Sequence, residues 1–154
     1  MKNIRPKKRY CILLSIMLFA CYTGCTMISP YSETAYKQAT SSKVEALTLM
    51  DKATEPYNTH KVEIEAFQRK IYEAYEYAKG RPKNELSARQ WEIMRDPDRY
   101  LIGGFISRWE KEDKLGKAFI EEAKQGLITQ AFDEIIGLES GKIKKNNAKI
   151  VGGE

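Results

Sequence analysis

The single histidine of the chain, His60, is one candidate for catalysis or metal binding, and it lies three positions before Glu63. On a helix this spacing places both side chains on one face, where they could hold a metal ion. Helical metal sites of this kind use Glu-x-x-His twice, with further carboxylates from other helices. The chain has one such pair, in reversed order, so we expect His60 to be an exposed residue in the first turn of a helix. It also lacks a recognisable serine or cysteine partner for a catalytic triad.

Acidic residues are the second kind of catalytic candidate, because paired carboxylates hydrolyse glycosides. Residue type alone selects Glu73, Glu76, Glu121, Glu122, Asp133 and Glu134. Lysines such as Lys117 and Lys124 are interleaved with them, which is typical of a solvated helix face. The pair Gly103-Gly104 lacks the glycine spacing and the Lys-Ser/Thr end of a phosphate-binding loop. We therefore predict no enzyme activity, no metal site and no cofactor.

Aromatic side chains form a more informative set. Its members are Tyr72, Tyr75, Trp91, Tyr100, Phe105 and Trp109. One interpretation places them in the core of a helical bundle. The other makes them the lining of a groove, between the second expected helix and the segments that follow it, for a small apolar ligand or a partner helix. Aromatic residues are enriched at such binding surfaces.

Lysines are concentrated near the C-terminus, at Lys142, Lys144, Lys145 and Lys149. One interpretation is a soluble, flexible end of the chain. The alternative is contact with anionic lipid headgroups or wall polymers, where each lysine near the surface contributes about 1 kcal/mol.

The first 25 residues contain the clearest signal. Five basic residues and no acid open the chain, namely Lys2, Arg5, Lys7, Lys8 and Arg9. An apolar core over 11–20 follows, and then come small residues, which is the layout of a secretory signal. A transmembrane anchor is the alternative, but it needs about 20 apolar residues, and this core has about half that number.

The end of this segment, Thr23-Gly24-Cys25, resembles the lipobox of bacterial lipoproteins. In that family the cysteine receives a diacylglycerol group, the signal is removed, and the cysteine becomes the lipidated first residue. Tyr22 stands where the family prefers Leu. Cys21 is the alternative, since Leu18 and Ala20 fit the pattern, although Phe19 is bulky for its place. Cys25 is favoured because cleavage before Cys21 leaves an odd thiol in an oxidising compartment.

The resemblance implies a lipoprotein of the cell membrane, with a cleaved signal over 1–24 and a lipidated tether over 25–31. Each buried CH₂ of an acyl chain such as palmitate contributes about 0.8 kcal/mol, so several chains anchor the protein firmly. In a Gram-negative cell, Thr26 differs from the aspartate of the inner-membrane retention signal, which implies the periplasmic face of the outer membrane. The expected partners are the membrane and an envelope protein or wall component.

Charge argues against nucleic acid as a partner. The chain has 26 basic and 21 acidic residues, and removal of the five basic residues of the signal leaves 21 of each. The mature chain is therefore neutral, whereas nucleic-acid-binding proteins carry a basic surface.

Apolar residues spaced three and four apart predict helices over 32–54, 59–79, 87–95, 98–112 and 115–139. We expect Ser32 to cap the first helix, Asn58 or Thr59 to cap the second, and Pro97 to stand in the first turn of the fourth. Trp91 and Met94 should face inward. Gly103-Gly104 should admit a neighbouring helix or mark a kink. Together these segments predict an all-α domain over 32–141, an antiparallel bundle of about four helices, followed by a flexible basic tail over 142–154.

Overall fold

A computed structural model describes residues 29–144 and 147–153, so Cys21, Cys25 and Lys145 lie outside the described residues. This part of the chain is all-α and contains no strand, which confirms the predicted helical bundle. In chain order its elements are α2 (Glu33–Asp51), the 3₁₀ turn η1 (Lys52–Thr54), α3 (Tyr57–Gly80), α4 (Glu85–Arg95), α5 (Ile102–Glu112), α6 (Lys117–Ala123), the π-type turn η2 (Lys124–Ile128) and α7 (Thr129–Glu139).

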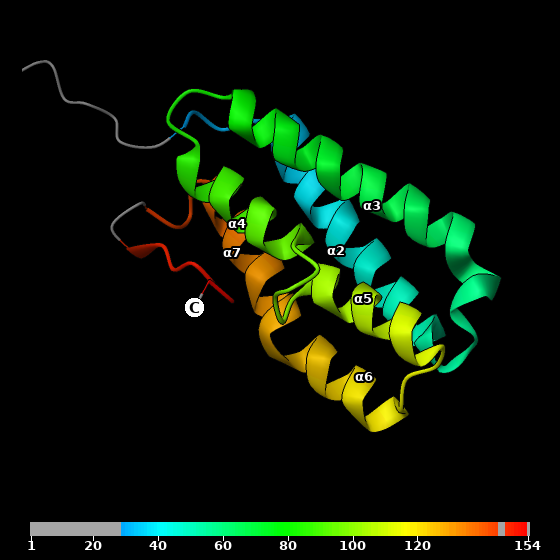
Figure 1. Cartoon of the computed structure of the whole chain (residues 1–154). Helices are drawn as coiled ribbons and strands as arrows, with labels where there is room; N and C mark the ends of the chain where they lie inside the picture. The colour runs from blue at the N-terminus through cyan, green and yellow to red at the C-terminus, as the bar shows by residue number, and fades with distance from the viewer. Residues whose placement is uncertain (1–28, 145–146, 154) are drawn as a thin grey trace, which may run out of the picture.

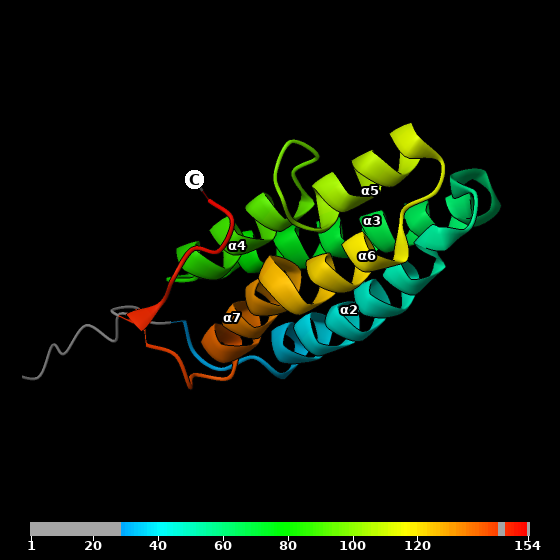
Figure 2. The same cartoon turned by 90° about the horizontal axis from the view of Figure 1, so that it is seen from below.

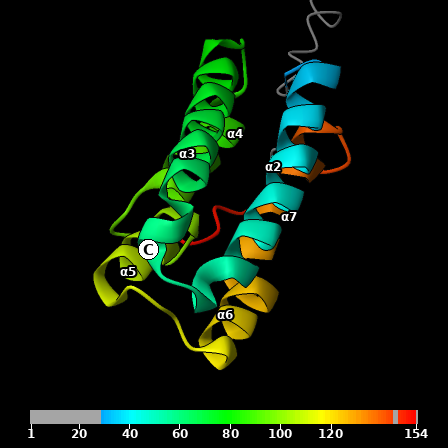
Figure 3. The same ribbon diagram turned by 90° about the vertical axis from the view of Figure 1, so that its right-hand side faces the viewer.

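The helices form a bundle of four rods, two of which are broken (Figure 1). The long helices α2 and α3 are two rods; α4 followed by α5 makes the third, and α6 followed by α7 makes the fourth. Figure 3 shows α3, α4 and α5 on one side and α2, α6 and α7 on the other. Around the bundle α2 packs on α3, α3 on α4, α4 on α7 and α7 on α2. This is the order of an up-and-down bundle with short connections.

Local sequence explains the start of α2. Ser32 has extended backbone angles, and its Oγ accepts a hydrogen bond from the backbone N–H of Ala35 at 3.2 Å, as predicted. This bond satisfies one of the amide groups that have no partner inside a helix.

The start of α3 corrects the prediction that Asn58 or Thr59 caps it. The helix begins at Tyr57, directly after Pro56, and no side chain next to it provides a cap. Instead the N–H of Tyr57 donates to the carbonyl oxygen of Asp113 at 2.9 Å and to its Oδ1 at 3.2 Å. The residue that follows α5 therefore caps α3 across the fold.

Aromatic and aliphatic side chains from all four rods fill the core. Trp91 and Met94 are buried as predicted, and Trp91 packs edge-on against Phe132 with ring centroids 6.0 Å apart. Trp109 is fully buried, and its Nε1–H donates to the carbonyl oxygen of Glu55 at 3.0 Å. This bond satisfies the one polar atom of a large apolar side chain.

The predicted start of a helix at residue 98 is wrong, because α5 begins at Ile102 and the preceding residues turn across its first turn. A Cβ on Gly103 would lie 2.5 Å from the carbonyl oxygen of Arg95, and a Cβ on Gly104 would overlap that of Arg99. The glycine pair therefore admits both the C-terminal end of α4, at Arg95, and the connection that follows it. This agrees with the expected close approach of a neighbouring helix.

The predicted continuous helix over 115–139 is also wrong. Gly126 has φ −90° and ψ −131°, which interrupts the α-helical hydrogen bonds, and the π-type turn η2 separates α6 from α7. The hydroxyl of Thr129 donates to the carbonyl oxygen of Lys124 and so satisfies one freed acceptor. The break changes which side chains of α6 and η2 face the core.

The C-terminal residues lie against the bundle, which corrects the expectation of a flexible tail (Figure 2). The fully buried Gln90 side chain donates to the carbonyl oxygen of Val151 at 2.9 Å and accepts from its N–H at 2.8 Å. Gly152 packs on Leu101. Two reciprocal hydrogen bonds with a buried side-chain amide hold Val151 against α4.

Candidate functional site

The structure does not unite the predicted aromatic residues in one groove. Trp91 and Trp109 belong to the core. Tyr72 and Tyr75 lie on α3, where the guanidinium of Arg95 covers both rings at 4.9 and 4.8 Å from their centroids. Such cation–π contacts occupy these rings within the fold. The expected groove between the second predicted helix and the segments that follow it is therefore not formed by these residues.

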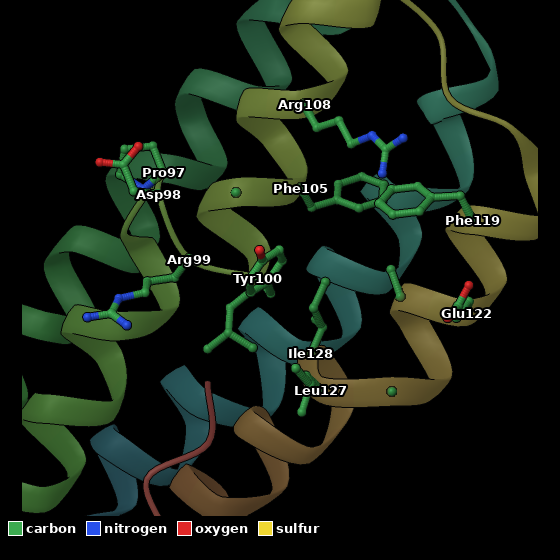
Figure 4. Close-up of a pocket in the computed structure, with 14 residues that line it drawn as sticks. Pro97, Asp98, Arg99, Tyr100, Phe105, Arg108, Phe119, Glu122, Leu127 and Ile128 are labelled. Atoms are coloured by element: carbon green, nitrogen blue, oxygen red, sulfur yellow. The ribbon is translucent and has the colours of Figure 1, made fainter. Parts of the chain in front are cut away.

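Tyr100 and Phe105 line a different cavity, between α5 and α6 (Figure 4). We call it the α5–α6 groove and define it by its apolar lining, namely Tyr100, Leu101, Phe105, Phe119, Leu127 and Ile128. Its volume is about 470 Å³. It exists because α5 and α6 are not among the closely packed helix pairs. Ala123, the last residue of α6, and Gly126, where the helix is broken, both line the groove.

Two stacked rings form one wall of the groove. Phe105 of α5 and Phe119 of α6 are nearly parallel, with an interplanar angle of 7°. The guanidinium of Arg108 lies 4.0 Å from the centroid of Phe119, while its Nε donates to Glu112 at 2.7 Å. The salt bridge and the ring fix the Arg108 side chain, which places a positive charge beside an apolar surface.

Charges of both signs surround the apolar interior. Arg99 and Arg108 contribute cations, and Asp98 and Glu122 contribute anions. Tyr100 is 86% exposed and Leu127 is 43% exposed. Large exposed apolar side chains that adjoin a cavity with a polar rim mark a binding surface. The arrangement can accommodate an apolar group and meet polar atoms next to it.

Sequence reasoning missed Phe119 and Leu127 because it assigned both to the core-facing row of one long helix. The signal that could have identified them is Gly126, which interrupts that row and precedes Leu127 directly. A glycine inside a helical pattern lowers helix stability by about 1 kcal/mol relative to alanine and marks a place where the helix can break.

His60 is more covered than predicted, since its side chain is only 14% exposed. Its Nε2 lies 2.7 Å from Glu55 Oε2, its Nδ1 lies 3.6 Å from Glu63 Oε2, and its ring packs against Trp109 at 5.7 Å. Across 29–144 and 147–153, no group of three or more His, Cys, Asp or Glu side chains is placed to hold a metal ion.

Two of the six acidic side chains singled out by type face lysines. Asp133 forms a salt bridge with Lys43 at 2.5 Å, and Glu76 lies 4.0 Å from Lys79. Glu122 stands at the rim of the α5–α6 groove.

The lysines of the C-terminal segment separate into two places. Lys142 and Lys144 are exposed just after α7. Lys149 lies along α7, where its backbone N–H donates to Glu134 Oε1 at 2.8 Å.

None of the helices in the described part of the chain combines the length and apolar character that a bilayer-spanning segment needs. Comparison of the chain with protein-family models, curated proteins and solved structures gives no significant match.

Proposed function

We propose that this protein is a lipid-anchored, non-catalytic binding module of a bacterial cell envelope, and that the α5–α6 groove binds an envelope partner. The lipobox resemblance of Thr23-Gly24-Cys25 supports the anchor, with Cys21 as the alternative lipidation site. The groove carries the binding part of the proposal, because a solvent-open apolar cavity with Tyr100 and Leu127 exposed at its mouth leaves apolar surface to be covered.

An apolar side chain presented by a partner protein fits the groove. Full burial of one large aliphatic or aromatic side chain contributes about 1.5–3 kcal/mol. Phe105 and Phe119 provide an apolar wall, and Arg108, which is paired with Glu112, offers a guanidinium next to it. A partner segment with an apolar anchor and an adjacent carboxylate would match both features.

A small apolar ligand is the second candidate occupant. The groove volume of about 470 Å³ falls within the range of ordinary ligand pockets, which is about 300–1,000 Å³. In that case the protein is a carrier or sensor anchored at the membrane.

Photo-crosslinking in intact cells tests the binding site. A photoreactive phenylalanine analogue replaces Tyr100 in the full chain, and the matched control carries it at Val62, which is 79% exposed on α3. A protein crosslinked from position 100 and not from position 62 supports the partner. No specific adduct at position 100 would contradict it.

Leu127→Glu should abolish the crosslinked adduct at position 100, since a carboxylate at the mouth of the groove opposes burial of an apolar group there. Val62→Glu is the matched control and should leave it unchanged. A co-purifying small molecule in native mass spectra, lost in Leu127→Glu, would support the carrier instead.

The anchor is tested separately by labelling cells with palmitate. Cys25→Ser should remove the label and release the protein from membranes, while Cys21→Ser should not. The reverse result would assign lipidation to Cys21.

A further inference from the structure

The N-terminal segment is held at one end of the bundle. The carbonyl oxygen of Pro30 accepts a hydrogen bond from Nη2 of Arg81, and the hydroxyls of Ser32 and Tyr77 lie 3.0 Å apart. Both contacts join the segment before α2 to the C-terminal end of α3. Figure 1 shows the first described residues at this end, next to the α3–α4 connection.

A buried polar cluster fixes Arg81 in this position. Its Nη1 forms a salt bridge with Glu139 of α7, whose side chain is only 1% exposed. The Nδ2 of Asn84 donates to the other carboxylate oxygen of Glu139 at 3.0 Å. A buried ion pair with its remaining acceptor satisfied has one well-defined geometry. Residues of α3, α7 and the α3–α4 connection therefore set the place where the chain enters the bundle.

Chain length places this end close to the lipid. Cys25 precedes Ser29 by four residues, which can span at most about 14 Å whatever their conformation. A bundle anchored through Cys25 therefore keeps this end at the bilayer surface. Electrostatic attraction acts over a comparable distance, since the Debye length is about 8 Å at physiological ionic strength.

The residues at this end match an anionic surface. We call them the tether end and define it as Tyr31, Lys79, Lys83, Lys142 and Lys144, all of which are exposed. Nearby acids are partly neutralised, because Glu139 pairs with Arg81, Glu76 lies 4.0 Å from Lys79 and Glu33 pairs with Lys37. Glu85 is exposed at the start of α4. Tyr31 is 62% exposed, and tyrosine is enriched at the level of lipid headgroups.

We infer that the tether end docks on anionic lipid headgroups and so orients the bundle on the membrane. The inference rests on the proposed lipid anchor and adds a second, electrostatic contact to it. In this orientation α5 and α6 occupy the half of the bundle away from the N-terminal segment (Figure 1), so their groove is presented to partners beyond the bilayer surface.

Acetylation of lysines by a water-soluble reagent, read by mass spectrometry, tests the docking. The lipidated full chain is reconstituted in phosphatidylcholine vesicles and in vesicles that also contain phosphatidylglycerol. Lysines of the tether end should react about threefold less in the anionic vesicles at low salt, and high salt should remove the difference. Lys61 and Lys111, exposed on the opposite half, should react equally in both.

A charge-reversal variant and its control make the test specific. Lys142→Glu with Lys144→Glu should remove the protection of Lys79 and Lys83, whereas Lys61→Glu with Lys111→Glu should retain it. Equal reactivity in the two vesicles, with the protein still floating with both, would overturn the docking and leave the anchor intact. A soluble anionic wall polymer, added to the same reaction, could instead protect these lysines. Protection by the polymer, with equal reactivity in the two vesicles, would overturn docking on lipid in favour of that polymer. A chain that floats with neither vesicle would overturn the docking together with the anchor.

Discussion

Phe105 of α5 and Phe119 of α6 stack along one wall of the α5–α6 groove with ring centroids 5.9 Å apart, although the helices that carry them are not closely packed elsewhere. An offset or parallel aromatic pair contributes about 0.5–1.5 kcal/mol beyond its buried area. The stack therefore braces two helices that leave a cavity between them, and it forms the wall on which an occupant would rest.

Removal of one ring should weaken the fold and change the groove. We expect Phe119→Ala to lower the free energy of unfolding by about 2 kcal/mol, since it loses both the stack and partly buried apolar area. Urea denaturation measures the loss. Val62→Ala, at a site 79% exposed, should change the same quantity by less than about 0.5 kcal/mol. Equal effects of the two substitutions would show that the stack contributes nothing.

The α4–α5 connection depends on the missing side chain of Gly104. Alanine has the higher helix propensity by about 1 kcal/mol, but its Cβ would overlap the carbonyl oxygen of Arg99. Gly104→Ala should therefore destabilise the protein, by about 2 kcal/mol net in chemical denaturation. Gly80→Ala, where nothing lies within 4 Å of the added Cβ, should be neutral or slightly stabilising. A stabilising Gly104→Ala would contradict the observed crossing.

The C-terminal segment should detach when Gln90 loses its amide. Gln90→Leu removes both hydrogen bonds to Val151, and each broken pair costs about 0.5–1.5 kcal/mol. We expect faster amide hydrogen exchange over 147–153, measured by mass spectrometry, with α2 and α3 unchanged. Gln68→Leu, on the exposed side of α3, serves as the control. Unchanged exchange over 147–153 would mean that other contacts hold the segment.

The buried carboxylate of Glu139 should matter far more than an exposed one. Glu139→Gln leaves Arg81 without its counter-charge and should lower the free energy of unfolding by about 3 kcal/mol. Glu92→Gln breaks the exposed pair with Arg89 and should cost less than about 1 kcal/mol. Thermal and urea unfolding compare the two. Similar losses would argue against a special role for the Arg81–Glu139 pair.

Acid should remove the contribution of the Glu63 carboxylate to the stability of the fold. The hydrogen bond from Lys52, with Nζ 2.6 and 2.7 Å from the two carboxylate oxygens, lowers the pKa of Glu63 below its ordinary value of 4.5. A lowered carboxyl pKa stabilises the fold above the unfolded pKa, and this stabilisation is lost as pH falls through the folded pKa. Glu63→Gln should therefore melt below the parent protein at pH 7.

The two melting curves should converge as pH falls below the folded pKa of Glu63. Glu73→Gln, at an exposed position on the same helix, serves as the control for a Glu→Gln substitution. A gap that persists in acid would contradict the ionic origin of the effect.

Local sequence was sufficient to predict the features that depend only on residues close together in the chain. Three/four spacing predicted every helical region, because one apolar face per segment must be buried. The hydroxyl of Ser32 predicted the start of α2, and the inward positions of Trp91 and Met94 followed from the same spacing.

Sequence alone also determined the charge balance, and it is the whole basis for predicting a secretion signal with a lipobox. These depend on residue type and order, without any contact between distant parts of the chain.

Only the tertiary structure decided the features that join distant residues. The cap of α3 comes from Asp113, the N-terminal segment is fixed through Arg81 and Glu139, and the C-terminal segment is held by Gln90. Each uses a partner at least 50 residues away in the chain, which helical periodicity cannot encode.

The α5–α6 groove is also a feature that only the tertiary structure shows. Gly126 is one residue in an otherwise regular row, and such a glycine lowers helix stability without deciding by itself whether the helix breaks. Here the chain breaks, α6 stands apart from α5, and Leu127 faces solvent at the mouth of a cavity. The sequence predicted a helical bundle, and the tertiary structure showed that the chain breaks at Gly126 and that the bundle is open beside this break.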